Sequence, residues 1–314
     1  MQVSSGLPDA LIDTHHHLWH LTCAHYPWLQ EAYDASTFIL GAYQPLCRDF
    51  GVPELRAAFG QLPVTATVHV EAERGRDEAL QETVWLHRQW QEHGLPNAVV
   101  AWVDLLAEDA EETLENQAAW PLVRGVRFKP VTARRAAERC AGKGSLHDPG
   151  WHAALDRLHR VGLSWDLRVP FWHLQDAARM LTDAPPVRVA LEHTGLPWDR
   201  SPEGLRVWRA GMEELAALPQ VQVKLSELGL RDAAWDEREN ASLVADAIRI
   251  FGPKRCMFGS NFPVASLRVD YAGLIRMTSL GMDMAGLDDA ARDAIWQANA
   301  RAFYRIGTVR TRGA

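Results

Sequence analysis

The 314-residue sequence has few cysteines and no excess of positive charge. Its four cysteines, at positions 23, 47, 140 and 256, are far apart and form no CxxC pair. This distribution argues against a zinc ribbon and against a disulfide framework. The formal net charge is −7, and the basic residues are scattered among acidic ones, so we expect no nucleic-acid partner.

Signals for membranes, export and dinucleotides are also missing. No apolar run approaches the roughly 18 residues needed to span a bilayer. The first residues, MQVSSGLPDALIDT, do not join a positively charged segment to an apolar one, as a secretory signal does. No GxGxxG follows the first strand-like run, which argues against a dinucleotide-binding fold. We therefore expect a cytoplasmic protein without a membrane partner, while self-association into a homo-oligomer stays open.

What the sequence does contain is an alternation of short β-rich runs with longer helical patterns. We expect strands at residues 10–15, 64–71, 97–105, 123–130, 163–169, 187–193, 221–226 and 255–260. Eight strands, most of them followed by a helix, favour a closed (β/α)8 barrel of the TIM type over an open doubly wound sheet. No linker rich in proline, glycine or serine divides the chain, so residues 1–314 are predicted to form one barrel domain.

Two long connections interrupt this alternation, at residues 18–52 and 131–150. They follow the first and the fourth expected strands. Connections after a barrel strand lie at the C-terminal end of the barrel, where barrel enzymes place their chemistry. Both segments are therefore candidate substrate-covering loops, with a simple surface excursion as the alternative.

Three histidines stand in a row at the end of the first expected strand, in IDTHHHLW. Side chains two residues apart share one face of a strand, so His15 and His17 can point together while His16 points the other way. The sixth strand ends in LEHTGLP, which brings His193 to the same end of the barrel. Asn261, in FGSNFP, follows the last strand, and its amide can form hydrogen bonds but cannot take a proton at neutral pH. These strand-end residues are the first candidates for a catalytic site.

Charged residues interrupt several strands that should be apolar. Arg127 and Lys129 share one face of the fourth strand, and Asp166 and Arg168 share one face of the fifth. Charges this close to a barrel core are costly unless they are paired or functional. We expect Arg127, Lys129 and Arg168 to clamp an anion or a carbonyl group of a substrate. Glu71, in the second strand, and Asp166 are each either a carboxylate of the site or an ion-pair partner.

The sequence contains thirteen tryptophans, and Trp19, Trp165 and Trp172 fall at or just after strand ends. An aromatic face can stack on a sugar or lactone ring, although large aromatic side chains more often fill protein cores. We keep Trp19 as a candidate substrate contact, with core packing as its alternative.

The motifs IDTHHHLW, VHVEAE, VRGVRFKP, LEHTGLP, VKLSELG and FGSNFPV occur in this order over nearly the full chain. Together with NARAFYRI at 299–306, they resemble the amidohydrolase-related family of the amidohydrolase superfamily, and within it the branch of sugar-acid and pyrone-dicarboxylate lactonases. The resemblance implies a distorted (β/α)8 barrel whose strand ends supply His15, His17 and His193. In metal-dependent relatives these histidines bind zinc or another divalent ion, while in lactonase relatives they can polarise the lactone carbonyl without a metal. The family usually has a water-activating aspartate after the last strand, and here that position is Asn261.

The strand-end cluster and the resemblance together predict a hydrolase that opens the ring ester of a small lactone, either a sugar-acid lactone or a carboxylated lactone or pyrone. Without the aspartate, the base would be Glu71, Asp166 or a histidine. Alternatively, zinc or manganese held by His15, His17 and His193 would lower the pKa of bound water. Two other readings stay open: a metal-dependent decarboxylase of a small aromatic acid, and a barrel that binds its ligand without turning it over.

Overall fold

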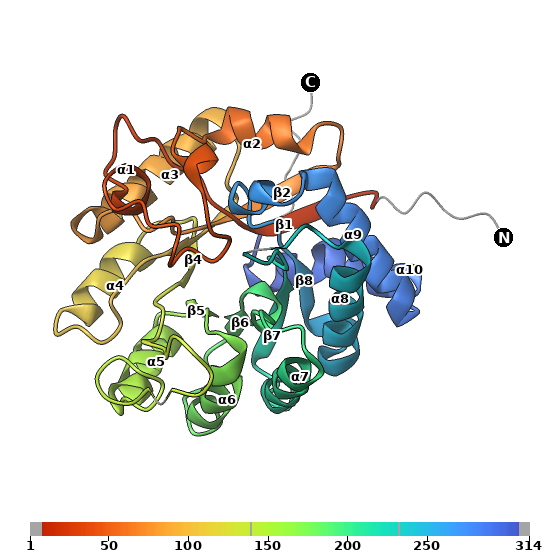
Figure 1. The fold of residues 1–314 in the computed structure, drawn as a ribbon. Coiled ribbons are helices and arrows are strands. Elements are labelled where there is room, and N and C mark those ends of the chain that lie inside the picture. The colour runs from red at the N-terminus through yellow and green to blue at the C-terminus, as the bar shows by residue number, and fades with distance from the viewer. Residues whose placement is uncertain (1–7, 139, 232, 308–314) are drawn as a thin grey trace.

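The computed structural model describes residues 8–138, 140–231 and 233–307 of the chain. Within these residues, eight parallel strands follow one another in sequence order around one sheet (Figure 1). They are β1 (Leu11–His16), β2 (Val64–Val70), β3 (Ala98–Ala101), β4 (Val123–Val126), β5 (Ser164–Leu167), β6 (Val189–Leu191), β7 (Val221–Leu225) and β8 (Cys256–Phe258). The segment after β8 meets β1, since the Asn261 N–H donates to the His15 carbonyl and the His17 N–H donates to the Phe262 carbonyl, both at 2.7 Å. The predicted (β/α)8 barrel is confirmed.

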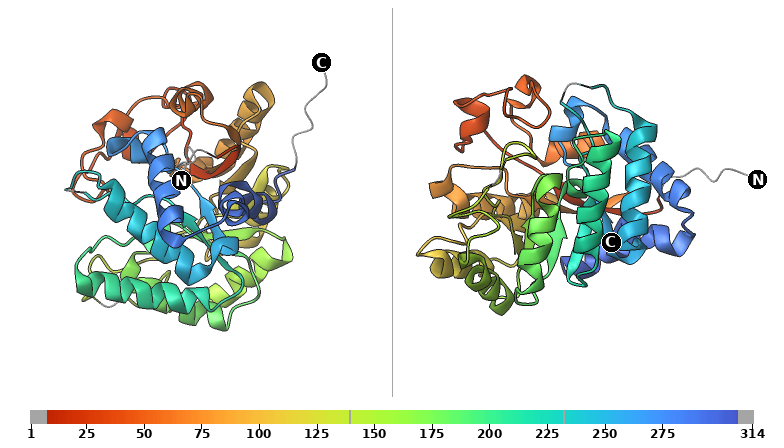
Figure 2. Two further views of the ribbon diagram at one scale, coloured as in Figure 1. Left: turned by 90° about the vertical axis from the view of Figure 1, so that its right-hand side faces the viewer. Right: turned by 60° about the horizontal axis from the view of Figure 1, so that its bottom comes forward.

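Helices surround the barrel on its outer side (Figure 2). They are α1 (Pro27–Gln30), α2 (Val52–Phe59), α3 (Ala79–His93), α4 (Ala110–Ala118), α5 (Gly150–Arg160), α6 (Leu174–Thr182), α7 (Pro202–Ala216), α8 (Glu237–Phe251), α9 (Tyr271–Ala285), α10 (Asp289–Asp293) and α11 (Asn299–Phe303). Side-chain caps start several of them: Asp236 accepts from the Glu239 N–H at α8, and Asp270 accepts from the Gly273 N–H at α9. Across the described ranges, none of the helices is long and apolar enough to cross a membrane.

Each expected strand is present, but most are shorter than the sequence pattern predicts. The third one shows why: β3 ends at Ala101, although the apolar pattern continues through residue 105. Val103 and Leu105 are buried after the chain has left the sheet. Their apolar character therefore reflects packing in the core rather than pairing with a neighbouring strand.

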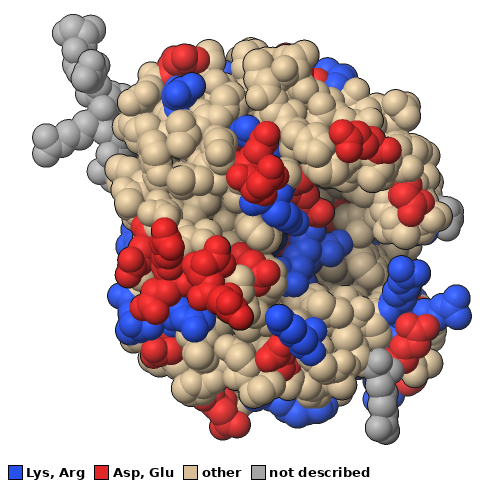
Figure 3. Space-filling model, turned by 90° about the vertical axis from the view of Figure 1, so that its left-hand side faces the viewer, with Lys and Arg blue, Asp and Glu red and all other residues tan. Residues whose placement is uncertain are grey.

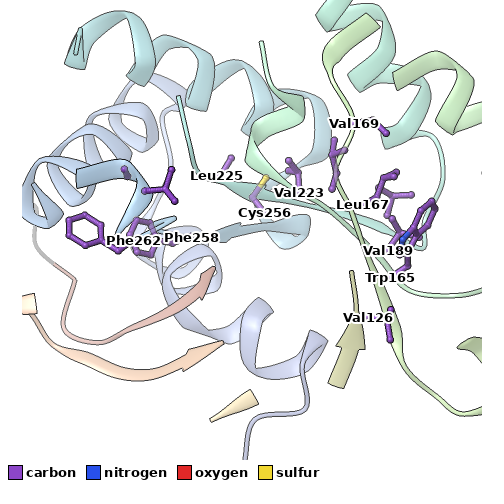
Figure 4. Packing of buried hydrophobic residues seen from close by; sticks show 14 of the residues in the cluster. Val126, Trp165, Leu167, Val169, Val189, Val223, Leu225, Cys256, Phe258 and Phe262 are labelled. Atoms are coloured by element: carbon purple, nitrogen blue, oxygen red, sulfur yellow. The ribbon is translucent and has the colours of Figure 1, made fainter. Parts of the chain in front are cut away.

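The apolar core has an outer and an inner part. The outer part packs the strands against the surrounding helices, and Figure 4 shows some of its members, including Trp165 and Leu167. The inner part lies within the barrel, where strand residues such as Ile12 and Val68 pack with Phe303 of α11. Just after α11, Arg305 Nη1 donates to the Gly162 carbonyl at 2.8 Å, which holds this segment to the loop before β5. The C-terminal segment therefore covers the N-terminal end of the barrel, which leaves the opposite end for a site.

A buried carboxyl group on α3 makes the stability of the fold depend on pH. Glu82 Oε1 accepts a hydrogen bond from the Ala72 N–H at 3.0 Å and lies 3.6 Å from His69 Nε2. His69 Nδ1 accepts from the Leu18 N–H, so the ring proton sits on Nε2. Burial, reinforced by the Glu71 carboxylate, raises the pKa of Glu82 to about 8. Glu82 therefore keeps a proton in the folded chain at neutral pH.

Glu82→Gln should remove this dependence. Between the ordinary pKa of 4.5 and the folded pKa of about 8, the folded chain holds a proton that the unfolded chain has lost, so Glu82 lowers stability as pH rises through this window. Glutamine keeps an acceptor for the Ala72 N–H and does not titrate. From the lower to the upper end of this pH window, we expect the free energy of unfolding of the variant to rise relative to that of the wild type by at least about 1 kcal/mol. Urea unfolding at both ends of the window measures this difference. Parallel pH profiles for the two proteins would contradict the assignment.

Candidate active site

A cavity of about 290 Å³, here called the inner cavity, opens at the C-terminal ends of the strands. Figure 3 shows this end of the molecule, hollowed near its centre, with lysine and arginine side chains in the hollow. The lining combines strand-end residues with residues of the segment between β1 and α2. It consists of His17, Trp28, Ala32, Asp34, Thr37, Phe38, Ile39, Tyr43, Ala72, Glu73, Arg127, Lys129, Arg168, His193, Asn261 and Val264.

The three histidines proposed from the sequence converge at this end of the barrel. The ring centroids of His15 and His17 are 5.0 Å apart, and those of His15 and His193 are 4.5 Å apart. His17 and His193 line the inner cavity, while His15 is fully buried beside them. Burial and nearby cations hold the pKa of each ring well below its ordinary value. All three imidazoles are therefore neutral at physiological pH, and each keeps a lone pair that can accept a hydrogen bond or bind a cation.

A chain of hydrogen bonds fixes the orientation of His17 and Asn261. His17 Nδ1 lies 2.7 Å from the Val70 carbonyl oxygen, which can only accept, so Nδ1 carries the proton and Nε2 a lone pair. That Nε2 faces Asn261 Oδ1 at 3.2 Å, while Asn261 Nδ2 donates to the Glu227 carboxylate. Burial raises the pKa of Glu227 to about 7. His17 Nε2 and Asn261 Oδ1 are thus two acceptors that face each other, and a proton or a cation between them would give both atoms a partner.

Glu192 lies between the histidines and the basic residues of the site. Its carboxylate oxygens are 3.6 Å from His15 Nδ1, 3.8 Å from His193 Nε2 and 3.4 Å from Arg127 Nη1. The sequence pattern alone does not mark Glu192 as a site residue, because it ends an otherwise apolar strand pattern. The sequence feature that could have identified Glu192 is its position next to His193, at the end of β6.

Unsatisfied buried atoms mark a place for a cation among these residues. Both ring nitrogens of His15 and Oε1 of Glu192 are buried without a hydrogen-bond partner in the described part of the chain, which is costly. One ligand atom from each of His15, Glu192 and His193 lies within 4.8 Å of the others. Imidazole nitrogens and carboxylate oxygens are the ligands of zinc and similar ions. These residues fit a divalent ion, and the group includes Glu192, which the ligand set predicted from the sequence, His15, His17 and His193, did not name.

Arg127 is paired on two sides. Its Nε donates to Glu71 Oε1 at 2.7 Å, its Nη1 lies 3.4 Å from Glu192 Oε2, and its Nη2 donates to the Glu71 carbonyl. Burial alone would raise the pKa of Glu71, but Arg127 and Arg76 hold it below its ordinary value. Glu71 is therefore an ionised ion-pair partner that does not line the inner cavity, and Arg127 presents only part of its guanidinium there.

Arg168 is the basic residue left free to meet a ligand. Lys129, which also lines the inner cavity, forms an ion pair with Glu73. Arg168 is half-buried and forms neither a hydrogen bond nor an ion pair with the described residues. An unpaired guanidinium in a partly buried cavity is a strong site for a carboxylate or a polarised carbonyl oxygen.

Asp166 and Trp19 lie away from the inner cavity. Asp166 is buried in the barrel interior, where its Oδ2 accepts from Lys224 Nζ and, at 2.8 Å, from the Tyr304 hydroxyl. Trp19 is fully buried, and its Nε1 donates to the Arg48 carbonyl at 2.6 Å. Of the alternatives considered from the sequence, the ion pair describes Asp166 and core packing describes Trp19.

Aromatic side chains of the long first connection supply a wall that the sequence analysis missed. Trp28 and Phe38 line the inner cavity with their rings stacked at 5.6 Å, and Tyr43 packs 4.3 Å from Phe38. Trp28 Nε1 donates to the Ala72 carbonyl at 2.9 Å, which fixes the wall to the chain after β2. Irregular segments carry no periodic pattern, so their inward-facing residues give no sequence signal.

Backbone strain is concentrated where the strands turn into this cavity. Glu73, His193, Glu227 and Asn261 all have positive φ, between 45° and 58°. Such conformations are unfavourable for residues with a Cβ and cluster at functional sites. The sharp turns bring Glu73, His193 and Asn261 to the cavity wall.

Residues 12–306 match the amidohydrolase family. The chain belongs to this family. This amidohydrolase is 30% identical to the uncharacterised protein y4mH of Sinorhizobium fredii over 298 residues, 95% of this chain and 99% of that protein. It is 28% identical to an L-fucono-1,5-lactonase of Burkholderia multivorans, over 94% of this chain and 96% of the relative.

Solved structures agree with the family. An amidohydrolase of Burkholderia multivorans with bound zinc superposes with a TM-score of 0.76 at 27% identity, covering 95% of this chain and all (100%) of the other. A 2-pyrone-4,6-dicarboxylic acid hydrolase structure from Pseudomonas putida, described as putative, has a TM-score of 0.67 at 19% identity, covers 96% of this chain and 100% of its own, and shows the shared fold. The family resemblance read from the motifs is confirmed.

Asn261→Asp should weaken this amidohydrolase rather than improve it. Asn261 Nδ2 donates to Glu227, and an aspartate has no proton to donate to a second carboxylate. Above the Glu227 pKa of about 7, we expect the free energy of unfolding to fall by about 1–3 kcal/mol and hydrolytic activity to fall with it. Urea unfolding with a chelator present measures the first effect, and initial rates measure the second.

The double variant Asn261→Asp/Glu227→Gln is the matched control. It exchanges the amide and the carboxylate between the two positions, so one donor again faces one acceptor. Most of the lost stability should return. A single variant as stable as the wild type at a pH above 7 would contradict the hydrogen bond between Asn261 and Glu227.

Proposed function

We propose that this amidohydrolase hydrolyses the ring ester of a small sugar-acid lactone. The observation that carries the proposal is the inner cavity itself, which neutral histidines and the unpaired guanidinium of Arg168 line together. Full-length relatives named L-fucono-1,5-lactonase support it. Hydrolysis of an ester needs a proton acceptor for water and fixed donors for the developing oxyanion, and both are present.

The size and lining of the inner cavity suit one sugar-sized ring. Its volume of about 290 Å³ lies at the small end of ligand pockets. Trp28 and Phe38 offer apolar faces on which a ring can stack, while Arg168 and Lys129 offer donors to its oxygens. This combination favours an oxygen-rich, ring-shaped substrate over an extended chain.

In the proposed reaction, water adds to the lactone carbonyl carbon and the ring carbon–oxygen bond breaks to give a hydroxy acid. Glu71 is held in ion pairs, and Asn261 cannot take a proton, so we assign His193 as the acceptor of the proton from water. Glu192, 3.8 Å from His193 Nε2, would stabilise the imidazolium that forms. Arg168 would hold the carbonyl oxygen as it gains charge.

A divalent ion fits beside these groups. When bound by His15, Glu192 and His193, zinc or manganese would supply Lewis-acid polarisation of the carbonyl and a lower pKa for water, and His193 would then act as a ligand in place of its role as proton acceptor. His17 and Asn261 then keep a positioning role, because their facing Nε2 and Oδ1 atoms border the same space.

His193→Ala should abolish ring opening without unfolding the chain. We expect the rate to fall at least about 100-fold, since a positioned general base contributes that much or more. Proton release from a panel of aldonolactones, including L-fuconolactone, measures the rate, and thermal unfolding checks the fold. The control is His152→Ala, an exposed histidine on α5. Wild-type activity in the His193 variant would sink the assignment, and carbon dioxide release from aromatic acids with no activity on lactones would favour the decarboxylase reading.

Removal of metal should lower the activity. Because His15 and Glu192 keep buried atoms without partners, we expect chelation to reduce the rate about tenfold or more and zinc or manganese to restore it. Elemental analysis should show bound metal in the wild type and a reduced amount in Glu192→Gln, with the exposed Glu111→Gln as control. Full activity in metal-free protein would instead assign the histidines as direct donors to the carbonyl.

A further inference from the structure

A second, larger cavity adjoins the inner one. It has a volume of about 910 Å³ and shares Thr37, Ile39 and Arg168 with the inner cavity. We call it the outer vestibule. It is lined by Ser36, Thr37, Ile39, Thr132, Ala133, Arg134, Arg135, Arg168, Pro170, Trp172, Trp198, Leu230, Arg231 and Ala233. Its residues come from the two long connections and from the turns after β5, β6 and β7.

Every charged residue that lines the outer vestibule in the described ranges is an arginine: Arg134, Arg135, Arg168 and Arg231. This is a marked local excess, because the whole chain carries a formal net charge of −7. Like charges gathered around one cavity repel each other unless a counter-ion or a ligand joins them. The vestibule is therefore suited to an anionic group.

These arginines are free to bind such a group. Arg231 is held in place by donating to the carbonyls of Ser36 and, at 2.7 Å, Phe38. The side chains of Arg134 and Arg135 form neither hydrogen bonds nor ion pairs with the described residues, and Arg168 is likewise unpaired. Three guanidinium groups around one cavity thus keep donors free for a ligand, although Glu73, Glu192 and Glu227 lie near enough to Arg168 to interact with its charge.

The segment that carries two of the arginines is anchored against the barrel. The Ala133 N–H donates to His173 Nε2 at 3.0 Å, and Trp172 Nε1 donates to the Ala133 carbonyl at 3.2 Å. Trp172 also packs against Trp198, with 5.7 Å between ring centroids. Both tryptophans line the vestibule, so an aromatic surface lies beside the guanidinium groups. Guanidinium groups bind carboxylate and phosphate through paired hydrogen bonds, and an aromatic face beside them can pack against the rest of the ligand.

We propose that the outer vestibule is a second substrate subsite, which binds a carboxylate or phosphate carried outside the lactone ring. The proposal rests on the lactonase function proposed above and specifies its substrate class. The ring would occupy the inner cavity, and the anionic arm would pass Arg168, the residue common to both cavities, to reach Arg134 and Arg135. The reaction itself is unchanged: water opens the ring ester, and the anionic arm is neither formed nor broken.

Two pairs of lactones test the subsite, each pair differing only in the anionic group. Cellobionolactone is compared with its analogue bearing a glucuronic acid as the second sugar, and gluconolactone with phosphogluconolactone. In at least one pair we expect the anionic member to have a kcat/KM at least about tenfold higher, mainly through a lower KM. The pair with the larger difference in kcat/KM shows whether the subsite prefers a carboxylate or a phosphate. Equal values within both pairs would overturn the proposal.

The double variant Arg134→Gln/Arg135→Gln should remove this advantage and leave kcat/KM for the neutral members within about twofold. Both residues are exposed, so the substitutions should leave the fold intact. Arg160→Gln/Arg206→Gln, on α5 and α7, removes the same charge from exposed positions and should change nothing. An anionic advantage that persists in the Arg134 and Arg135 variant, or disappears equally in the control, would overturn the subsite.

A binding measurement separates this subsite from the proposed function. Calorimetric titration with the ring-opened products requires no catalysis. Every ring-opened product carries the new carboxylate, so the comparison is between products with and without the additional carboxylate or phosphate. Products with the additional group should bind at least about tenfold more tightly to the wild type, and both kinds should bind equally to the Arg134 and Arg135 variant. Binding with this pattern, without hydrolysis of any lactone, would overturn the lactonase function and keep the anionic subsite. Equal affinity of the wild type for products with and without the additional anionic group would overturn the subsite.

Discussion

The site depends on the ion pairs that the buried guanidinium of Arg127 forms. It joins Glu71, beyond β2, to Glu192, beyond β6, from a position beyond β4. Without it, the buried Glu192 would lose its ion-pair partner and Glu71 would keep only Arg76, at a cost of about 3–5 kcal/mol. Arg127 also keeps Glu192 directed toward His15 and His193. The charge balance of the whole strand-end cluster therefore follows from one residue.

Below this layer, the barrel interior is polar in its middle and apolar at its base. Lys224 Nζ donates to the Thr14 carbonyl at 2.8 Å and to Asp166, which also accepts from Tyr304. The Lys224 side chain thus links the residue before His15 to the C-terminal segment. That segment covers the N-terminal end of the barrel, and at the opposite end His17 and His193 line the inner cavity, which adjoins the outer vestibule.

The sequence pattern predicted the strands and the face on which side chains point, but not their depth. His15 and His17, or Asp166 and Arg168, share a face because they are two residues apart, and yet each pair spans two layers of the barrel. Arg168 therefore reaches the cavity, whereas Asp166 lies one layer deeper, where Lys224 neutralises it. How deep a side chain lies in the barrel depends on the stagger between neighbouring strands. The alternation of side chains within one strand does not reveal that stagger.

Two further parts of the site escaped the sequence for different physical reasons. Glu192 looked like the end of an apolar strand, and its role follows only from the approach of His15 and Arg127 from other strands. Trp28 and the vestibule arginines at 134 and 135 lie in long connections whose conformation is fixed by tertiary contacts, such as that of Trp28 with the Ala72 carbonyl. Local pattern cannot report contacts between segments this far apart.

The central claim is that water attacks the carbonyl of a lactone ring held in the inner cavity. The most direct measurement is mass spectrometry of the product formed from an aldonolactone in heavy-oxygen water, with the rate compared to the uncatalysed background. The account predicts acceleration well above background, with one heavy oxygen in the carboxylate and none in the alcohol. No acceleration for any lactone of the panel, or label in the alcohol oxygen, would contradict it.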